Sequence, residues 1–186
     1  MSGKVGEPSG SKDDRSEPQH ALSGVDFDRL EEIGDLHAQA SAFSSALEYY
    51  RRLLDEPSLL HQPLTRACGV LRKCIDAALG LGDLSMAESL LERATQFLGE
   101  PELSVDERAL LLAPLMGRRA IVLSRRNSHT EALKLAKHAF TILAVTDSHG
   151  EVASLQVTMG VCHHRLGRLD KAQEFGQAKY PVLVSI

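Results

Sequence analysis

The sequence predicts an all-α protein, and three observations support that prediction. Hydrophobic residues make up 43% of the 186 residues, but aromatic residues make up only 4% and tryptophan is absent. The core must therefore be built from small and aliphatic side chains, which suit closely packed helices better than a β-sandwich. A phrase with helical periodicity returns four times along the chain, and helix start and stop signals lie at its edges.

The recurring phrase is clearest in "GDLSMAESLLERA", residues 82–94. Its first alanine, Ala87, aligns with alanines at 46, 132 and 172, and the four are separated by 41, 45 and 40 residues in chain order. A turn begins five residues before each alanine, and twelve residues before it stand Gly34, Ile75, Ala120 and Gly160. Each unit is therefore predicted to be a helix, a short turn and a second helix.

The expected helices, in chain order, are 26–40, 43–55, 62–80, 83–98, 104–126, 128–145, 149–165 and 168–179. The second and fourth end near "DEP" and "GEP", where a proline commonly follows a helix. "SVDE" at 104–107 and "SHGE" at 148–151 predict Ser-x-x-Glu capping boxes at the start of the fifth and seventh helices. Pro114 is expected to kink or split the fifth helix near residues 111–114, because proline has no backbone N–H and clashes with the preceding turn.

The two ends of the chain are predicted to differ from the helical part. Residues 1–25 are rich in Gly, Ser, Pro and charge, and such a segment buries too little apolar surface to offset its ordering entropy, so we expect a disordered tail. Residues 26–179 form the helical repeat domain, with about four units of which the last is incomplete. Residues 180–186 form a non-helical tail, because Pro181 cannot continue a helix. We expect a shortened form of a longer repeat protein, whose exposed last hydrophobic face promotes self-association.

These units resemble the tetratricopeptide repeat, which has a Leu-Gly pair in its first helix and then Ala, an aromatic residue and a closing Pro in its second. Residues 31–57 match through Ile33-Gly34, Ala46, Tyr50 and Pro57, and residues 157–175 match through Met159-Gly160, Gly167, Leu169 and Ala172. The family period is about 34 residues, so these units are long. The resemblance implies a right-handed α-solenoid, in which stacked units share a core. The structural repeat positions are Gly34, Ala46, Tyr50, Gly82, Ala87, Ala94, Ala132, Ala139, Gly160, Gly167 and Ala172.

The resemblance also implies a non-catalytic protein-interaction module, an adaptor or the sensor part of a signalling regulator, that binds a partner peptide in a concave groove lined by first helices. The groove is expected to run from acidic at its start to basic at its end, where an acidic ligand would gain charge-assisted hydrogen bonds. Solvated surface arginine is the alternative. A small secretion chaperone, or a fragment of a larger transcriptional regulator, also stays open. The partner-binding candidates are Arg72, Arg118, Arg125, His164 and Arg165.

Composition and motifs argue against several other classes of protein. A net charge of −4 does not suit nucleic-acid binding, which needs a basic surface. No apolar run approaches the ~20 residues of a membrane span, and the odd, irregularly spaced Cys68, Cys74 and Cys162 indicate a reducing, cytoplasmic setting. "CHH" at 162–164 points its side chains about 100° apart around a helix. We therefore expect no metal, no cofactor and no catalysis.

Overall fold

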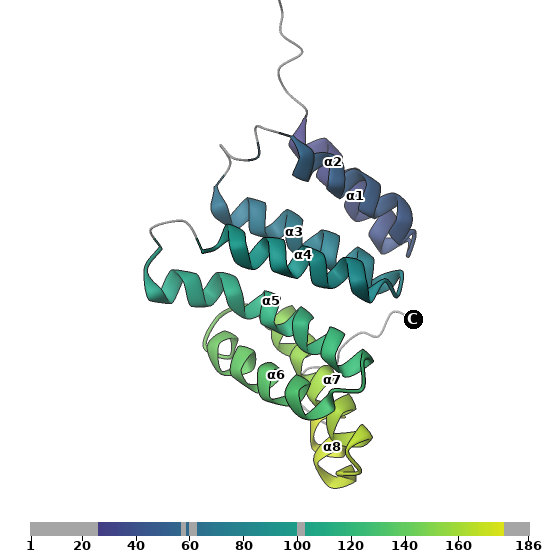
Figure 1. Ribbon diagram of the computed structural model, residues 1–186, viewed down its shortest axis with the longest axis vertical. Coiled ribbons are helices and arrows are strands. Elements are labelled where there is room, and N and C mark those ends of the chain that lie inside the picture. Colours follow the sequence, from purple (N-terminus) through teal and green to yellow (C-terminus); the bar gives the residue numbers. More distant parts are fainter. Residues whose placement is uncertain (1–25, 57–58, 60–62, 100–102, 177–186) are drawn as a thin grey trace, which may run out of the picture.

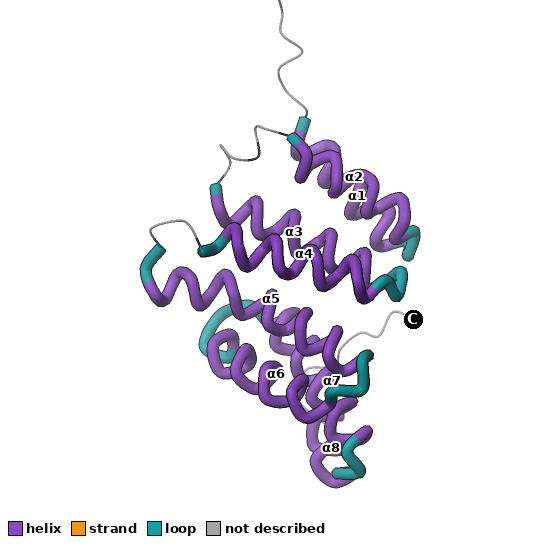
Figure 2. The backbone as a smooth tube through the Cα atoms, viewed as in Figure 1, coloured by secondary structure: helices purple, strands orange, loops and turns teal. Residues whose placement is uncertain are grey.

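The computed structural model describes residues 26–56, 59, 63–99 and 103–176. Within these ranges the chain forms eight helices and no strand (Figure 2). The all-α prediction is therefore confirmed. The tails predicted at 1–25 and 180–186, and the last residues of the predicted repeat domain, 177–179, lie outside the described residues.

The helices form four consecutive pairs, and each pair is joined by a short turn. Apart from the end of α8, which adjoins residues outside the described ranges, every boundary falls within two residues of its prediction. The bounds are α1 (Phe27–Gln39), α2 (Phe43–Asp55), α3 (Leu64–Gly80), α4 (Leu84–Phe97), α5 (Val105–Arg125), α6 (His129–Leu143), α7 (His149–Arg165) and α8 (Leu169–Gly176).

The pairs follow one another along the long axis of the molecule (Figure 1). The second helix of each pair also packs on the first helix of the next, so that α2 contacts α3, α4 contacts α5 and α6 contacts α7. Two hydrophobic clusters result, one over the first two pairs and one over the last two. Helix α5 belongs to both, because Leu115 and Val122 face the first cluster while Ala113 and Ala120 face the second. The described chain is thus a helical solenoid whose halves are joined by α5.

All four pairs use the same turn. In the first, the Ala42 amide donates to the His37 carbonyl at 2.8 Å and the Ser41 amide donates to the Ala38 carbonyl at 2.9 Å. The same two bonds recur in the other three turns. This is the Schellman motif, which needs one residue in the left-handed region. That residue is the first of each predicted turn: Ser41, Gly82, Asn127 and Gly167, with φ of 57°, 76°, 64° and 71°.

Small residues lie where the helices of a pair approach each other. A Cβ on Gly34 would lie 2.5 Å from Cε1 of the Tyr50 ring, so the first pair packs glycine directly against the aromatic residue. The repeat alanines Ala46, Ala87 and Ala132 are fully buried. Because an alanine in such a crossing has no room beyond its methyl group, these positions fix the spacing of the helices.

Pro114 does not split the fifth helix, and that alternative of the sequence-based prediction is wrong. Helix α5 runs without interruption from Val105 to Arg125 with the proline inside it. The missing donor leaves one carbonyl, that of Leu110, without its helical partner, and Leu110 is an exposed residue. Buried neighbours on both sides of the proline, Ala113 and Leu115, hold the two parts of the helix against the rest of the solenoid. Tertiary packing therefore outweighs the local cost of the proline, about 3 kcal/mol.

Of the two predicted capping boxes, only the first forms. The Ser104 hydroxyl accepts from the Glu107 amide at 3.2 Å, and the Glu107 carboxylate accepts from the Ser104 amide at 3.1 Å. Ser148 occupies the corresponding N-cap position of α7, but its side chain makes no capping hydrogen bond. The capping box predicted at 148–151 is therefore wrong, because the carboxylate of Glu151 is held instead by two arginines of other helices.

Candidate functional site

The first helices of the four pairs lie next to one another along one face of the solenoid, which we call the first-helix face. Helix α3 contacts α5, and α5 contacts α7, while ion pairs join α1 to α3. This is the face on which the sequence placed the partner-binding groove. Its charged residues come from different repeats, so only the tertiary structure brings them together.

At the start of the first-helix face, the acidic residues of α1 are paired with cations of α3. Lys73 Nζ lies 2.7 Å from Oε1 of Glu31 and 2.6 Å from Oδ2 of Asp35. Arg66 pairs with Asp28 and, at 3.3 Å, with Glu31. The acidic charge expected at this end of the groove is therefore partly neutralised within the protein.

In the centre of the face, four charged side chains form a continuous network across three helices. The guanidinium of Arg118 on α5 makes a two-point contact with Asp76 on α3, with both distances 2.9 Å. Arg118 also pairs with Glu151 on α7. Glu151 in turn pairs with Arg72 on α3, at 3.2 Å between Oε1 and Nη1. Side chains of α3 and α7 thus meet over α5 and occupy the centre of the first-helix face.

Arg118 is the most deeply placed member of this central network. Its side chain is only 11% exposed and that of Glu151 only 17%. Burial opposes the charge of Arg118, but the hydrogen bonds and charges of Asp76 and Glu151 more than offset it and raise the pKa of Arg118 above its usual value. The pairing matches the rule that a buried guanidinium is accompanied by carboxylates.

Arg125 also has a partner inside the protein. Its Nη1 lies 2.5 Å from the carbonyl oxygen of Leu79, in the last turn of α3. The last four carbonyls of a helix have no partner within the helix, and a cation there also interacts favourably with the helix dipole. Arg125 therefore helps to cap the carboxyl end of α3, the neighbouring first helix.

At the other end of the first-helix face, no further helix follows α8 within the described residues. A cavity of about 520 Å³ lies between α7 and α8. Val157 and Val161 line it and are 48% and 46% exposed. His164 and Arg165 stand beside them, and neither side chain has an ion pair or a hydrogen bond with another described residue. The full lining is Gln156, Val157, Gly160, Val161, His164, Arg165, Ala172, Phe175 and Gly176.

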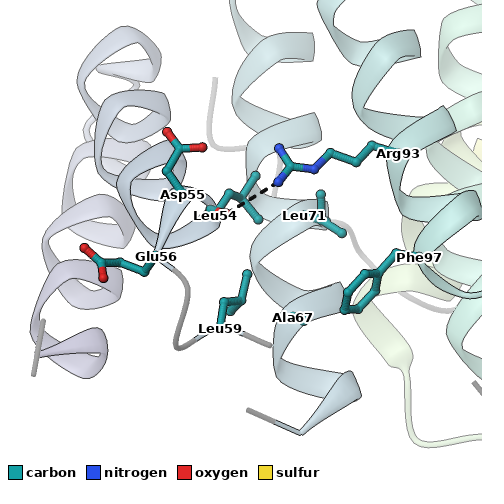
Figure 3. A pocket seen from close by; sticks show the side chains of 8 residues that line it. All are labelled: Leu54, Asp55, Glu56, Leu59, Ala67, Leu71, Arg93 and Phe97. Carbon is teal, nitrogen blue, oxygen red and sulfur yellow. Dashed lines mark hydrogen bonds between the residues drawn. The ribbon is translucent and has the colours of Figure 1, made fainter. Parts of the chain in front are cut away.

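Two further cavities lie elsewhere. One of about 390 Å³ lies along the acidic side of α1 and includes Glu31, Glu32 and Asp35. The other, of about 260 Å³, lies among α2, α3 and α4 (Figure 3), where Arg93 reaches across to the carbonyl of Leu54 at 3.4 Å. Its remaining lining is Asp55, Glu56, Leu59, Ala67, Leu71 and Phe97. Leu59 is a described residue, but its neighbours 57–58 and 60–62 lie outside the described ranges.

The structure separates the five predicted partner-binding residues into two groups. Arg72, Arg118 and Arg125 contact other helices of the solenoid, whereas His164 and Arg165 border the open cavity. The groups belong to different repeats, and only the side chains of the second have no polar partner among the described residues. A partner-binding role for all five stays a prediction.

Sequence reasoning missed Arg66, Lys73 and Glu151. One signal was present for the first two. Asp28 and Asp35 are seven residues apart on one first helix, and Arg66 and Lys73 are seven apart on the next. Seven residues is close to two helical turns, so the two acidic residues and the two basic residues have the same spacing along their helices. Asp28 can therefore pair with Arg66 while Asp35 pairs with Lys73. Glu151 was missed for another reason: its position three residues after Ser148 predicted a capping box instead of an ion pair.

Within the described residues there is neither a metal-binding group of side chains nor an exposed thiol. No group of three His, Cys, Asp or Glu side chains is placed to hold a metal ion within the described ranges. The thiols of Cys68, Cys74 and Cys162 are free and buried, and burial raises the pKa of Cys74 to about 12. Since the thiolate is the nucleophile, these cysteines are suited to packing. A search of the described helices finds none with the length and apolarity that crossing a bilayer requires.

Stacked helix pairs with a shared turn define a helical-repeat protein. Residues 111–178, which hold most of the third and fourth pairs, match the family model described as tetratricopeptide repeat. This part of the chain is thus similar to tetratricopeptide repeats, and the predicted resemblance is confirmed. That family is typically non-catalytic, and its repeats suggest a protein–protein interaction module.

Comparison with solved structures gives a similar chain in BtubC (BKLC) from P. vanneervenii, with a TM-score of 0.49 and 18% sequence identity. The match covers 82% of this chain and 55% of that one, so this chain spans about half the length of BtubC. No curated protein sequence matches this chain.

Proposed function

We propose that this chain is a non-catalytic interaction module that binds a partner protein at the α7–α8 end of its first-helix face. One observation carries the proposal. The central network of Asp76, Arg118, Glu151 and Arg72 occupies the middle of the face. The α7–α8 cavity instead combines accessible apolar surface with the Arg165 guanidinium and the His164 imidazole, which have no polar partner among the described residues.

The chemistry of the cavity indicates the kind of segment it would accept. Val157 and Val161 provide apolar surface in neighbouring turns of α7. Arg165 lies four residues beyond Val161, on the same face of the helix. An apolar side chain followed by a carboxylate would satisfy both features. A charge-assisted hydrogen bond of this kind contributes about 1.5–3 kcal/mol, so Arg165 would set affinity and the valines would set the position of the segment.

The proposal gives Arg72 and Arg118 a different part from the one the sequence indicated. Their charges are already used within the protein, and a partner carboxylate would have to compete with Asp76 and Glu151 for them. The partner contacts are therefore assigned to His164 and Arg165. A cytoplasmic location is proposed as well, and the buried free cysteines support it, because disulfides are rare in that compartment.

The proposal is tested by placing a photoreactive amino acid at Val157 in the full chain and irradiating native cells. The matched control carries the same amino acid at Val145, which is 89% exposed and follows α6. A protein that crosslinks from Val157 but not from Val145 identifies the partner. Equal crosslinking from both positions, or none from Val157, would place the binding surface elsewhere.

The identified partner segment then allows a direct test of the charge. Arg165→Glu should weaken binding of the purified segment by about 10-fold or more, following the free energy above, while Arg165→Lys should weaken it less. Reversing the partner's matching acidic residue should recover binding to Arg165→Glu. Unchanged affinity for Arg165→Glu would refute the assignment of Arg165.

A further inference from the structure

Helices α7 and α8 meet at a pair of stacked rings. The imidazole of His163 is stacked on the ring of Phe175, with 5.6 Å between the ring centroids and 12° between the ring planes. Close to this stack the two helices approach each other, because a Cβ on Gly160 would lie 3.3 Å from Cβ of Phe175. Phe175 thus packs on the backbone at Gly160 and on the ring of His163, which lies three residues further along the same face of α7.

The stack holds a helix that is otherwise packed only at its surface. No residue of α8 is buried; Ala172 and Phe175 are half-buried, and its other residues are exposed. Both half-buried residues line the α7–α8 cavity together with Gly160. The contact between His163 and Phe175 therefore fixes the position of the wall that α8 gives to this cavity.

His163 is a buried titratable residue with an unsatisfied ring nitrogen. The residue is 2% exposed, and its buried Nδ1 has no hydrogen-bond partner among the described residues. In a neutral imidazole one ring nitrogen carries a lone pair, whereas in the imidazolium both nitrogens are donors. A buried donor without an acceptor loses its hydration and gains nothing in return. The packed arrangement of α7 and α8 therefore favours the neutral form of His163.

The charges around His163 act in the same direction. Three cations lie near enough to repel a positive ring: Lys137 of α6, Arg168 of the turn before α8, and Lys171 of α8. Glu174 of α8 attracts it, with the smallest effect of the four. Helix α5 also packs on α7, but no described charged group of α5 is among those acting on the ring. Burial first, and then the three cations, lower the pKa of His163 below its usual value.

We propose that the His163–Phe175 stack is a pH-sensitive latch, which holds α8 on α7 while His163 is neutral and releases α8 when His163 gains a proton. In the released state the imidazolium reaches water and moves away from the cations of α8. The α7–α8 cavity then loses the wall formed by Ala172 and Phe175, so a partner segment binds more weakly in mild acid. This last step rests on the proposed function, whereas the latch itself stands on the packing of α7 and α8.

Proton linkage gives the size of the effect. Once α8 is released, His163 titrates near 6.5, as an exposed histidine does. If the latched state binds no proton at this site, the ratio of released to latched molecules rises by up to about 10-fold between pH 7.5 and pH 5.5. The apparent affinity for a partner segment falls with the fraction of molecules that stay latched.

The latch is tested by measuring hydrogen exchange of the α8 amides in the full chain, with each rate divided by that of an unstructured peptide at the same pH. We expect the normalised rate to rise severalfold between pH 7.5 and pH 5.5. His163→Phe keeps an aromatic ring in the stack but removes its titration, so it should abolish most of the rise. The matched control, His138→Phe, replaces an exposed histidine of α6 and should leave the rise unchanged. A rise that survives His163→Phe, or no rise in the natural chain, would overturn the proposal.

A second measurement needs no variant. The imidazole proton signals of His163, recognised by their contacts with the Phe175 ring, are followed by NMR through the same pH range. We expect a pKa below 6.5, together with loss of the contacts to Phe175 as the ring gains its proton. A pKa above 6.5 with the contacts retained would show that the face of Phe175 stabilises the cationic ring, and the latch would then be refuted.

Photocrosslinking from Val157 separates this inference from the proposed function. The assay is repeated in cell lysate at pH 7.5 and pH 5.5, where capture of the partner should fall severalfold in the natural chain and much less in His163→Phe. No capture at pH 7.5, with the His163-dependent rise in α8 exchange intact, refutes the proposed function alone. Equal capture at both pH values, with no rise in α8 exchange, refutes the latch alone.

Discussion

Replacing Arg118 by Met should lower the stability of this solenoid more than replacing any single surface arginine. The change removes a cation whose side chain is 11% exposed and leaves Glu151, 17% exposed, with Arg72 as its remaining cation. Removing one partner of a buried ion pair costs about 3–5 kcal/mol. Because Arg72 still partly neutralises Glu151, we expect the lower end of that range, about 3 kcal/mol.

The measurement is urea denaturation followed by circular dichroism at constant pH and salt. The matched control is Arg52→Met, which removes an exposed pair with Glu48 within one helix; such pairs contribute about 0.3–0.5 kcal/mol. The double variant Arg118→Met with Glu151→Met should recover part of the loss, because it removes the uncompensated carboxylate as well.

Arg118 also links the two halves of the solenoid, because its partners lie on α3, which belongs to the first hydrophobic cluster, and on α7, which belongs to the second. Its loss should therefore broaden the unfolding transition as the two halves begin to unfold separately. If Arg118→Met is no more destabilising than Arg52→Met, the central network contributes little to stability, and its arginines would be available to a partner after all.

Three further predictions follow from the repeat geometry. Ala87→Glu should lower the free energy of unfolding by more than about 4 kcal/mol, because it places a charge at a fully buried helix crossing. Ala172→Glu, at the half-buried equivalent position, should lower it much less. Equal losses of melting temperature would show that the repeat register is wrong. Gly82→Ala should destabilise the protein by about 1 kcal/mol, because Gly82 has a left-handed φ of 76° and the space around an added Cβ is free, so that only backbone strain contributes. Asn127→Gly should be neutral or stabilising in the same thermal assay. A neutral Gly82→Ala would contradict the strain argument. Burial and the charges of neighbouring lysines and arginine lower the pKa of His163 below its usual 6.5, so the unfolded chain binds this proton at a higher pH than the folded chain does. The free energy of unfolding should therefore fall as the pH drops below about 6.5. In calorimetry at several pH values, His163→Phe should reduce that dependence, and an unchanged pH profile would exclude His163 as its source.

The helix pairs and their turns could be predicted from the sequence, because those features depend on residues close together in the chain. The spacing of Ala46, Ala87 and Ala132 marked the crossings within pairs, and the capping box at Ser104 formed as expected. The first residue of each turn was also located, whereas the left-handed backbone at Ser41 and Asn127 is seen only in the structure. Local propensity and short-range hydrogen bonds decide these elements, and they are written in short windows of sequence.

The pairing of the charged residues, by contrast, depends on contacts between repeats. Glu151 has the position of a capping residue, yet it binds Arg72 and Arg118, which lie 79 and 33 residues away in the chain. Pro114 should interrupt a helix, yet packing on both sides keeps α5 continuous. Both outcomes depend on distances between repeats, and those distances follow from how the pairs stack. Among the described residues, the same stacking fills the centre of the first-helix face with ion pairs and leaves the α7–α8 cavity without a covering helix, which no local pattern of residues encodes.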